Sequence, residues 1–504
     1  MSHWPIAPVL VPLVTGAVLL VLRGRGVQRA LAVAAVLTQL GLALGLMAKV
    51  SDGTALVYAL GAWPAPFGIV LVADRLAAWM LVITALVALF ALGYAVRGDD
   101  QAGPHFHPLY QWQLLGLNGA FLTGDLFNLF VFFEILLIAS YALVLHGGTD
   151  PGRTRAGLHF VVVNLVGSSL FLIAVGTLYG ILGTLNMADL SLKVAGTPPE
   201  SVALVRAAGL LLFGVFALKA ALLPLHLWLP ASYAQATAPV AALFAVMTKV
   251  GAYSILRVFV PIFGPHAGPV ANLTGPWLLP LALATLALGS LGALAARGLR
   301  RQVAYLVIGS VGSLLTAFGL GNAAGIAAGL YYLPHSTFAT AALFLLADLI
   351  ARGRGDLGDR LDPGPAIPRA VALGLLFFTL AIAVVGLPPL SGFLGKALTL
   401  RAALTHPWMP GVFAVVLLGG LCGLIALARS GSLIFYRPGS GQGVAVPAAA
   451  GPDPVAQALV TGLVLLILGL TFFAGPLTEL TSGMAADLLQ PAAQMQAVLG
   501  EGVR

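Results

Sequence analysis

Long apolar runs alternate with short polar segments along nearly the whole chain. A helix needs about 20 mostly apolar residues to cross the hydrocarbon core of a bilayer, and the runs are continuous rather than alternating, which disfavours strands. The pattern predicts an all-α polytopic membrane protein with about fourteen transmembrane helices. The predicted spans are residues 5–22, 27–48, 68–96, 107–123, 126–147, 158–182, 203–236, 239–261, 276–296, 302–321, 323–351, 369–404, 411–436 and 455–478.

Two of these spans are too long for one straight helix, and both contain prolines. Pro224 interrupts the seventh, and Pro388 and Pro389 interrupt the twelfth. Proline removes a backbone hydrogen bond, and broken helices at matching places in two halves of a chain point to an ion site in transporters. We therefore expect helices 7 and 12 to be discontinuous and to belong to two inverted five-helix repeats, although residue identity between the halves is poor.

This pattern divides the chain into four parts. Residues 1–106 hold helices 1–3, residues 107–261 the first repeat (helices 4–8), and residues 276–436 the second repeat (helices 9–13). Residues 437–504 hold a cytoplasmic loop, helix 14 and a C-terminal tail. The fourth span is the weakest, because it is short and only residues 123–125 separate it from the fifth.

Composition supports the membrane interpretation and excludes several others. Apolar residues make up 60% of the chain and charged residues 8%, against about 25% charged residues in an ordinary soluble domain. A soluble enzyme, a nucleic-acid binder and a disordered scaffold are excluded as descriptions of the whole chain. The single cysteine, Cys422, permits no disulfide framework. The first run has no basic leader or small-residue cleavage site, so we expect it to be a retained span.

The loop charges predict an orientation. If the N-terminus is outside, fifteen basic residues fall in the cytoplasmic loops and six in the outer segments, as the positive-inside rule requires. The fifteen are Arg23, Arg25, Arg29, Arg97, Arg153, Arg155, Arg297, Arg300, Arg301, Arg352, Arg354, Arg360, Arg369, Arg429 and Arg437; the six are Lys49, Lys193, Arg206, Arg257, Arg401 and Arg504. We expect a bacterial inner-membrane protein with both termini on the periplasmic side.

Charged residues inside the spans are candidates for function. Three of the five lysines, Lys219, Lys249 and Lys396, lie in apolar runs, where a charge costs about 2.5–3.5 kcal/mol on insertion scales. The alternative is that they extend to an interface. Glu134 lies in the middle of LFVFFEILLIASYAL, and a buried carboxylate needs a partner, for which Lys219 is the obvious candidate. The alternative is a purely structural bridge between two helices.

His335 lies in YYLPHSTFATAALFLL, and an imidazole titrates near neutral pH, which suits a proton relay. The alternative is a satisfied polar core residue. Asp74, Arg75 and Asp125 lie near helix N-termini, where capping and anchoring are expected. The residues expected to support the polar groups in the membrane are Tyr141, Pro224, His226, Thr248, Ser336, Thr337, Thr340 and Pro389. No nucleophile–base pair, phosphate loop or metal-ligand cluster is evident, so neither a cofactor nor enzymatic activity is expected.

Two segments resemble a known family. PLHLWLPASYAQATAPVAALFAVMTKVGAYSILR (224–257) resembles the core signature of the antiporter-like membrane subunits of respiratory complex I, membrane hydrogenases and multisubunit Mrp-type Na+/H+ antiporters. FLTGDLFNLFVFFEILLIASYAL (121–143) and the chain length are most similar to the D-type subunit of the Mrp-type antiporters. The resemblance extends over essentially the whole chain.

The resemblance implies a role for each intramembrane charge. Glu134 matches the helix-5 glutamate that pairs with the helix-7 lysine, here Lys219, and Lys249 matches the helix-8 lysine. His335 matches the central histidine, and Lys396 the helix-12 lysine near the far half-channel. In the family these residues form a polar axis along the membrane midplane.

One departure concerns the middle of that axis. Several relatives carry a second lysine four or five residues after the central histidine, where this chain has Ala339 and Thr340. The middle of the relay would then depend on His335, Ser336, Thr337, Thr340 and water.

The resemblance implies a proton-translocating subunit of a monovalent cation (Na+ or K+)/proton antiporter. Its partners would be the A-, B-, C-, E-, F- and G-type membrane subunits, protons, the transported cation and the lipid bilayer, with no nucleic acid. One alternative is a proton-pumping membrane subunit of a complex I-like NADH:quinone oxidoreductase or membrane hydrogenase. Another is a scaffold or assembly subunit whose charges merely pair.

Overall fold

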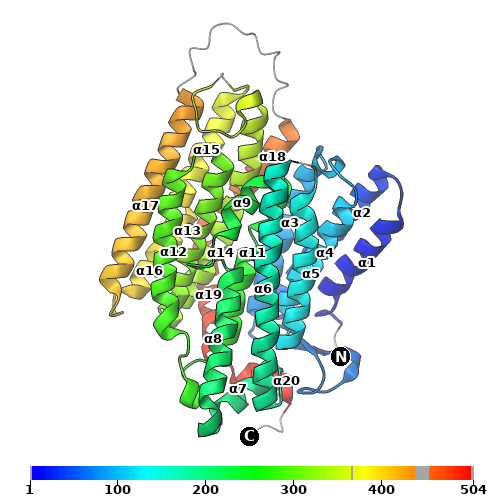
Figure 1. The fold of residues 1–504 in the computed structure, drawn as a ribbon, viewed down its shortest axis with the longest axis vertical. Helices are drawn as coiled ribbons and strands as arrows, with labels where there is room; N and C mark the ends of the chain where they lie inside the picture. Colours follow the sequence, from blue (N-terminus) through cyan, green and yellow to red (C-terminus); the bar gives the residue numbers. More distant parts are fainter. Residues whose placement is uncertain (1–2, 149, 365–366, 437–452, 501–504) are drawn as a thin grey trace.

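The computed structural model describes residues 3–148, 150–364, 367–436 and 453–500, and most of them lie in helices that run along the long axis of the molecule (Figure 1). The helices are α1 (Ala7–Val21), α2 (Arg25–Lys49), α3 (Arg75–Ala95), α4 (Phe106–Leu122), α5 (Leu126–Leu145), α6 (Pro151–Leu182), α7 (Met187–Ala195), α8 (Val202–Lys219), α9 (Trp228–Gln235), α10 (Ala238–Phe244), α11 (Met247–Phe259), α12 (Gly275–Ala295), α13 (Leu299–Gly319), α14 (Ala323–Arg352), α15 (Ala370–Val385), α16 (Ser391–Ala403), α17 (Met409–Gly431), α18 (Pro454–Phe472), α19 (Ala474–Leu489) and α20 (Ala492–Leu499). A π-helical turn (Ser432–Tyr436) extends α17, and the strands are β1 (Leu56–Ala59) and β2 (Val70–Ala73).

The predicted helical membrane architecture is confirmed. Thirteen of the fourteen predicted spans coincide with one helix or with two consecutive helices, and the span at 68–96 contains a strand and a helix. Within the described residues, eleven helical segments are long and apolar enough to cross a membrane, and α1 and α15 are shorter apolar helices. The exact number of crossings stays a prediction.

The predicted discontinuities are also confirmed, because the seventh span divides into α8 and α9 and the twelfth into α15 and α16. In the first break the freed backbone is satisfied by protein: the amide of Leu222 donates to the carbonyl of Ala217 at 2.9 Å, and that of Leu223 to the Thr285 hydroxyl of α12 at 2.9 Å. Broken backbone is tolerated at membrane depth only with such partners. The eighth span, divided into α10 and α11, and the last, divided into α18 and α19, contain breaks that we did not predict.

A two-stranded antiparallel hairpin lies outside the helical prediction. β1 pairs with β2, and the amide of Gly124 donates to the carbonyl of Val70 at 2.9 Å, so β2 also supports the turn between α4 and α5. All four residues of β2 are buried, and a fully buried strand has the same continuous apolar pattern as a buried helix. The apolar run at 68–96 therefore concealed a strand followed by a helix.

Both ends of the described chain lie at the same end of the helical bundle, which we name the termini face (Figure 1). We name the opposite end the arginine face, because the turns after α1, α3, α5, α12 and α14 lie there, with arginines in or beside them. Two ion pairs join neighbouring elements at this face: Nε of Arg29, on α2, lies 2.7 Å from Asp100 Oδ2, and Arg97 pairs with Asp453 at the start of α18. Burial tends to raise the pKa of Asp100, but the hydrogen bonds and charges of Arg29 and His107 together outweigh it and leave that pKa below its usual value.

Basic residues of the arginine face form a network of contacts around Asp348. Asp348 of α14 accepts hydrogen bonds from Tyr94 Oη of α3 at 2.7 Å and from Arg300 Nη2 of α13 at 2.5 Å. Arg352 Nε lies 2.6 Å from the same carboxylate, and Arg352 Nη2 lies 2.9 Å from Asp99. These contacts hold the ends of α3, α13 and α14 together.

The bundle is packed most closely between α12 and α13. A Cβ atom added at Gly289 of α12 would lie 2.3 Å from the backbone nitrogen of Gly309 of α13, and one added at Gly312 would lie 2.4 Å from the nitrogen of Leu286. Small residues allow membrane helices to approach this closely. The neighbouring helix α14 is the buried centre of the bundle, with every residue of its most apolar segment buried.

Gly289→Ala is expected to destabilise the protein, because the new methyl group separates α12 from α13 and overpacking typically costs about 1–3 kcal/mol. Thermal unfolding of the detergent-solubilised protein measures the effect as a lower midpoint. Gly176→Ala on α6 is the control, since nothing lies within 4 Å of its added Cβ. Equal midpoints for the two variants would contradict the close packing.

Candidate transport site

The five titratable residues predicted to carry protons lie in three clusters, of which the first joins Glu134 and Lys219 through α6. The carboxylate of Glu134 on α5 accepts a hydrogen bond from Ser168 Oγ of α6. Lys219 Nζ, buried at the end of α8, donates to Asn164 Oδ1 at 3.2 Å, one turn from Ser168 on α6. Glu134 and Lys219 form no direct ion pair within 4.0 Å, so the expected pair is bridged in this structure.

Sequence reasoning missed the two bridging residues, Asn164 and Ser168. Both are buried, and their spacing of four places them on one face of α6. This spacing is the feature of the sequence from which the two residues could have been predicted. The adjacent Ser169 is exposed, and its hydroxyl donates only to the carbonyl of Leu165 at 3.2 Å.

Lys219 is the last residue of α8, immediately before the break. Backbone carbonyls at a helix C-terminus favour a cation. Pro224 and His226 lie within the break, and His226 is 6% exposed with no hydrogen-bond partner at Nδ1. The break therefore brings a lysine and a histidine into one region of the chain.

The second cluster contains Lys249 of α11. Its side chain is fully buried, and its Nζ donates to Ser310 Oγ of α13 at 3.3 Å. No carboxylate of the described residues lies within 4.0 Å of it. The neighbouring Thr248 is also buried, and its hydroxyl has no partner. An uncompensated lysine in a membrane span is costly and is a functional candidate by default.

The third cluster surrounds the break between α15 and α16. His335 of α14 is 1% exposed, and its Nδ1 lies 2.8 Å from Ser391 Oγ at the start of α16. Its Nε2 has no hydrogen-bond partner. Lys396 Nζ donates to the carbonyl of Val385, the last residue of α15, at 2.6 Å. Pro389 lies in the same break, so His335 and Lys396 both contact the discontinuous helix.

The remaining predicted residues make few hydrogen bonds to the three clusters. Ser336 and Thr337 donate to the carbonyl of Leu333 in their own helix, at 3.0 and 2.7 Å, and Thr340 is buried. Tyr141 packs edge-on against a phenylalanine ring, and its hydroxyl has no partner. Within the described residues, neither hydroxyl donates a hydrogen bond to a group outside α14.

Asp74, Arg75 and Asp125 were expected to cap or anchor helix N-termini, and Arg75 Nε lies 3.0 Å from Asp487 Oδ2 of α19. Asp74 and Asp125 cap α3 and α5, as predicted, by accepting from the third residue of each helix at 2.8 Å. Arg257, which the charge count placed in an outer segment, is instead buried on α11 and pairs with Asp74. The apolar run at 239–261 therefore contains a second buried basic residue besides Lys249.

Residues 123–422 match the family described as the transmembrane part of the NADH:quinone oxidoreductases and Mrp antiporters. The chain belongs to this family. The matched region contains all three clusters. A probable D-type subunit of a K+/H+ antiporter from Rhizobium meliloti is 41% identical, with 99% of this chain and 98% of the relative covered.

Two further relatives are similar to this chain over nearly its full length. The D-type subunit of the Na+/H+ antiporter of Alkalihalophilus pseudofirmus is 37% identical, with 99% of this chain and 100% of the relative covered. A chain in the solved Mrp complex of Dietzia sp. is 28% identical, with a TM-score of 0.89, and 99% of this chain and 100% of that chain are covered. The fold of this chain is therefore that of an Mrp membrane subunit.

Replacing Lys249 by methionine is expected to raise the thermal unfolding midpoint of the solubilised protein. The change keeps the length of the side chain and removes a buried charge whose cost at a helix centre is about 2.5–3.5 kcal/mol on insertion scales. Lys193→Met is the control, because Lys193 is exposed on α7 and pairs with Asp189 at 2.9 Å. A midpoint that falls for Lys249→Met would show that the ammonium group stabilises the fold.

Proposed function

We propose that the chain is the proton-translocating subunit of a multisubunit monovalent cation/proton antiporter of the Mrp type. The observation that carries the proposal is the series of titratable side chains in membrane spans: Glu134, Lys219, Lys249, His335 and Lys396. Each of them hydrogen-bonds to a side chain of a neighbouring helix or to a backbone carbonyl at a helix break.

The relatives support the class of transport but leave the cation open. One relative is named as a subunit of a K+/H+ antiporter and another as a subunit of a Na+/H+ antiporter. Na+ and K+ are therefore the two candidate cations. As a D-type subunit, the chain would assemble with the A-, B-, C-, E-, F- and G-type membrane subunits in the bacterial inner membrane.

The first cluster would act as the charge switch. A nearby negative charge favours the protonated form of a lysine, and desolvation favours the neutral form. In the bridged arrangement, Ser168 and Asn164 transmit the position of the Glu134 carboxylate to Lys219. Opening or closing this bridge would change the proton affinity of Lys219 without moving a whole helix.

The proton would then pass towards the second and third clusters through water. Lys249 with Ser310 and His335 with Ser391 provide groups that can accept and donate a proton, and Lys396 ends the series at the carbonyl of Val385. We propose that residues 107–261 and 276–436 form two repeats that share this axis. Proton entry gains about 2.3 kcal/mol per charge per 100 mV of membrane potential, which can drive export of Na+ or K+.

The proposed direction of proton flux follows from the charges of the loops. The arginine face would lie in the cytoplasm, as the positive-inside rule requires, and the termini face would lie in the periplasm. Proton flux would then run from the termini face to the arginine face.

Lys219→Ala is expected to abolish cation-dependent collapse of a pH gradient while the complex stays assembled in the membrane, because the switch loses the group that carries the proton. The assay uses everted vesicles of an antiporter-deficient bacterium that expresses the chain with its operon neighbours, with Na+, K+ and Li+ added in turn. Lys193→Ala on α7 is the control and should retain activity.

The other outcomes separate the alternatives. No collapse for any cation by an intact wild-type complex would contradict antiport and favour a redox-driven proton pump, the other activity in the family description. Normal exchange by Lys219→Ala would contradict the switch and favour a scaffold whose charges merely pair.

A further inference from the structure

A buried ion pair lies at the termini face beneath the C-terminal helix α20. Arg257, 5% exposed near the end of α11, donates from Nη1 to Asp74 Oδ2. The other carboxylate oxygen of Asp74 caps α3 by accepting from the amide of Ala77 at 2.8 Å. The pair is removed from solvent, and neither residue belongs to the three clusters described above.

α20 is attached to this pair through one side chain. Gln494 Nε2 donates to Asp74 Oδ2 at 3.0 Å, so one carboxylate oxygen accepts from both Arg257 and Gln494. None of the residues of α20 is buried, although the helix contacts α7 and β1. Within the described residues, this is the only side-chain hydrogen bond from α20 to the rest of the chain. The helix is therefore held lightly.

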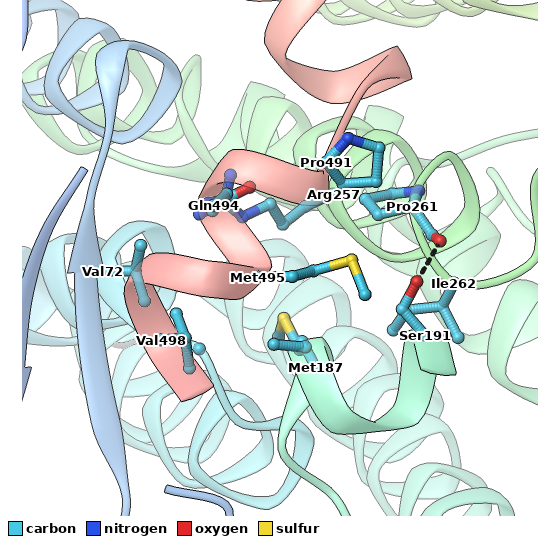
Figure 2. Close-up of a pocket in the computed structure, with 12 residues that line it drawn as sticks. Val72, Met187, Ser191, Arg257, Pro261, Ile262, Pro491, Gln494, Met495 and Val498 are labelled. Atoms are coloured by element: carbon cyan, nitrogen blue, oxygen red, sulfur yellow. Dashed lines mark hydrogen bonds between the residues drawn. The ribbon is translucent and has the colours of Figure 1, made fainter. Parts of the chain in front are cut away.

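Two cavities meet at α20. A cavity of about 40 Å³ beneath the helix reaches Arg257, Gln494 and Met187, and is large enough for water (Figure 2). An open pocket of about 990 Å³ lies outside it. Both are lined by Ser191, Pro261, Pro491 and Met495. Because residues of α20 line both, movement of α20 would widen the path from the outer pocket to the ion pair.

α11 connects the ion pair to the membrane interior. Lys249, Tyr253 and Arg257 follow each other at intervals of four residues, so they lie along one side of the helix, and eight residues span about 12 Å. The hydroxyl of Tyr253 donates to the carbonyl of Phe121 at 2.6 Å. The buried ion pair is thus two turns from the lysine of the second cluster.

We propose that Asp74, Arg257 and Gln494 form a gate at the termini face, and that displacement of α20 admits water to the α11 side of the first repeat. Gln494 is the latch, because it alone joins α20 to the buried carboxylate. The role in proton access depends on the proposed antiport function, whereas the opening of α20 does not.

Cysteine labelling tests the opening directly. Met187 lines the inner cavity but not the outer pocket, and Cys422 is the only native cysteine, so Met187→Cys in a Cys422→Ser background gives a single reporter. The intact complex in lipid nanodiscs is treated with a bulky, charged maleimide. Gln494→Ala should increase the labelling rate about tenfold, as expected when a hydrogen bond to a charged group is lost.

Gln496→Ala is the matched control for labelling. Gln496 lies on the same helix and lines only the outer pocket, so its loss should leave the labelling rate unchanged. Equal labelling rates for Gln494→Ala and Gln496→Ala would overturn the role of Gln494 as a latch. So would a parent protein that is labelled as fast as Gln494→Ala.

A reversible cross-link tests the role in transport. Ser191→Cys and Met495→Cys, joined by a short reducible bis-maleimide, would hold α20 closed. Cation-dependent exchange should be lost on cross-linking and return on reduction. Exchange that continues in the fully cross-linked complex would overturn the access role. Faster labelling in a complex that shows no exchange at all would instead count against antiport and leave the gate standing.

Discussion

The structure depends on one constraint: inside a bilayer, charges and free backbone groups find no water and must be satisfied by protein. In the two broken helices, a lysine lies beside each break in the backbone. Lys219, the last residue of α8, donates to the Asn164 side chain of α6, and Lys396 donates to the last carbonyl of α15. The breaks that expose the backbone therefore also make lysines tolerable, and these are the places where a proton can be held.

Contacts elsewhere in the fold hold the central helices of the bundle together. Asp348 and its basic partners join the helix ends at the arginine face, close glycine contacts join α12 to α13, and α14 is buried at the centre. Rigid helices hold the polar groups in fixed positions. A change of one hydrogen bond at Ser168 or Asn164 can then alter the environment of Lys219 while the bundle stays intact.

Much of this could be predicted from the sequence, because hydropathy reports lipid exposure and proline reports a missing hydrogen bond. Glu134, Lys249 and His335 were recognisable as charges or titratable groups in apolar runs. Other features could not be predicted, because they depend on partners distant in the chain. Strand β2 is as apolar as a buried helix. Asn164 is recognisable as a site residue only from its contact with Lys219. Arg257 was predicted to lie in an outer segment, because its partner Asp74 is distant in the chain.

The central claim is that α6 couples Glu134 to Lys219, and two adjacent serines test it most directly. Ser168 donates to Glu134, whereas Ser169 is exposed and contacts only its own helix. The purified complex in proteoliposomes, with an internal pH dye and an imposed Na+ or K+ gradient, reports proton flux without any electron donor. We expect Ser168→Ala to slow this flux about tenfold or more, as loss of a hydrogen bond to a charged group implies, and Ser169→Ala to leave it unchanged. Equal flux in the two variants would contradict the coupling.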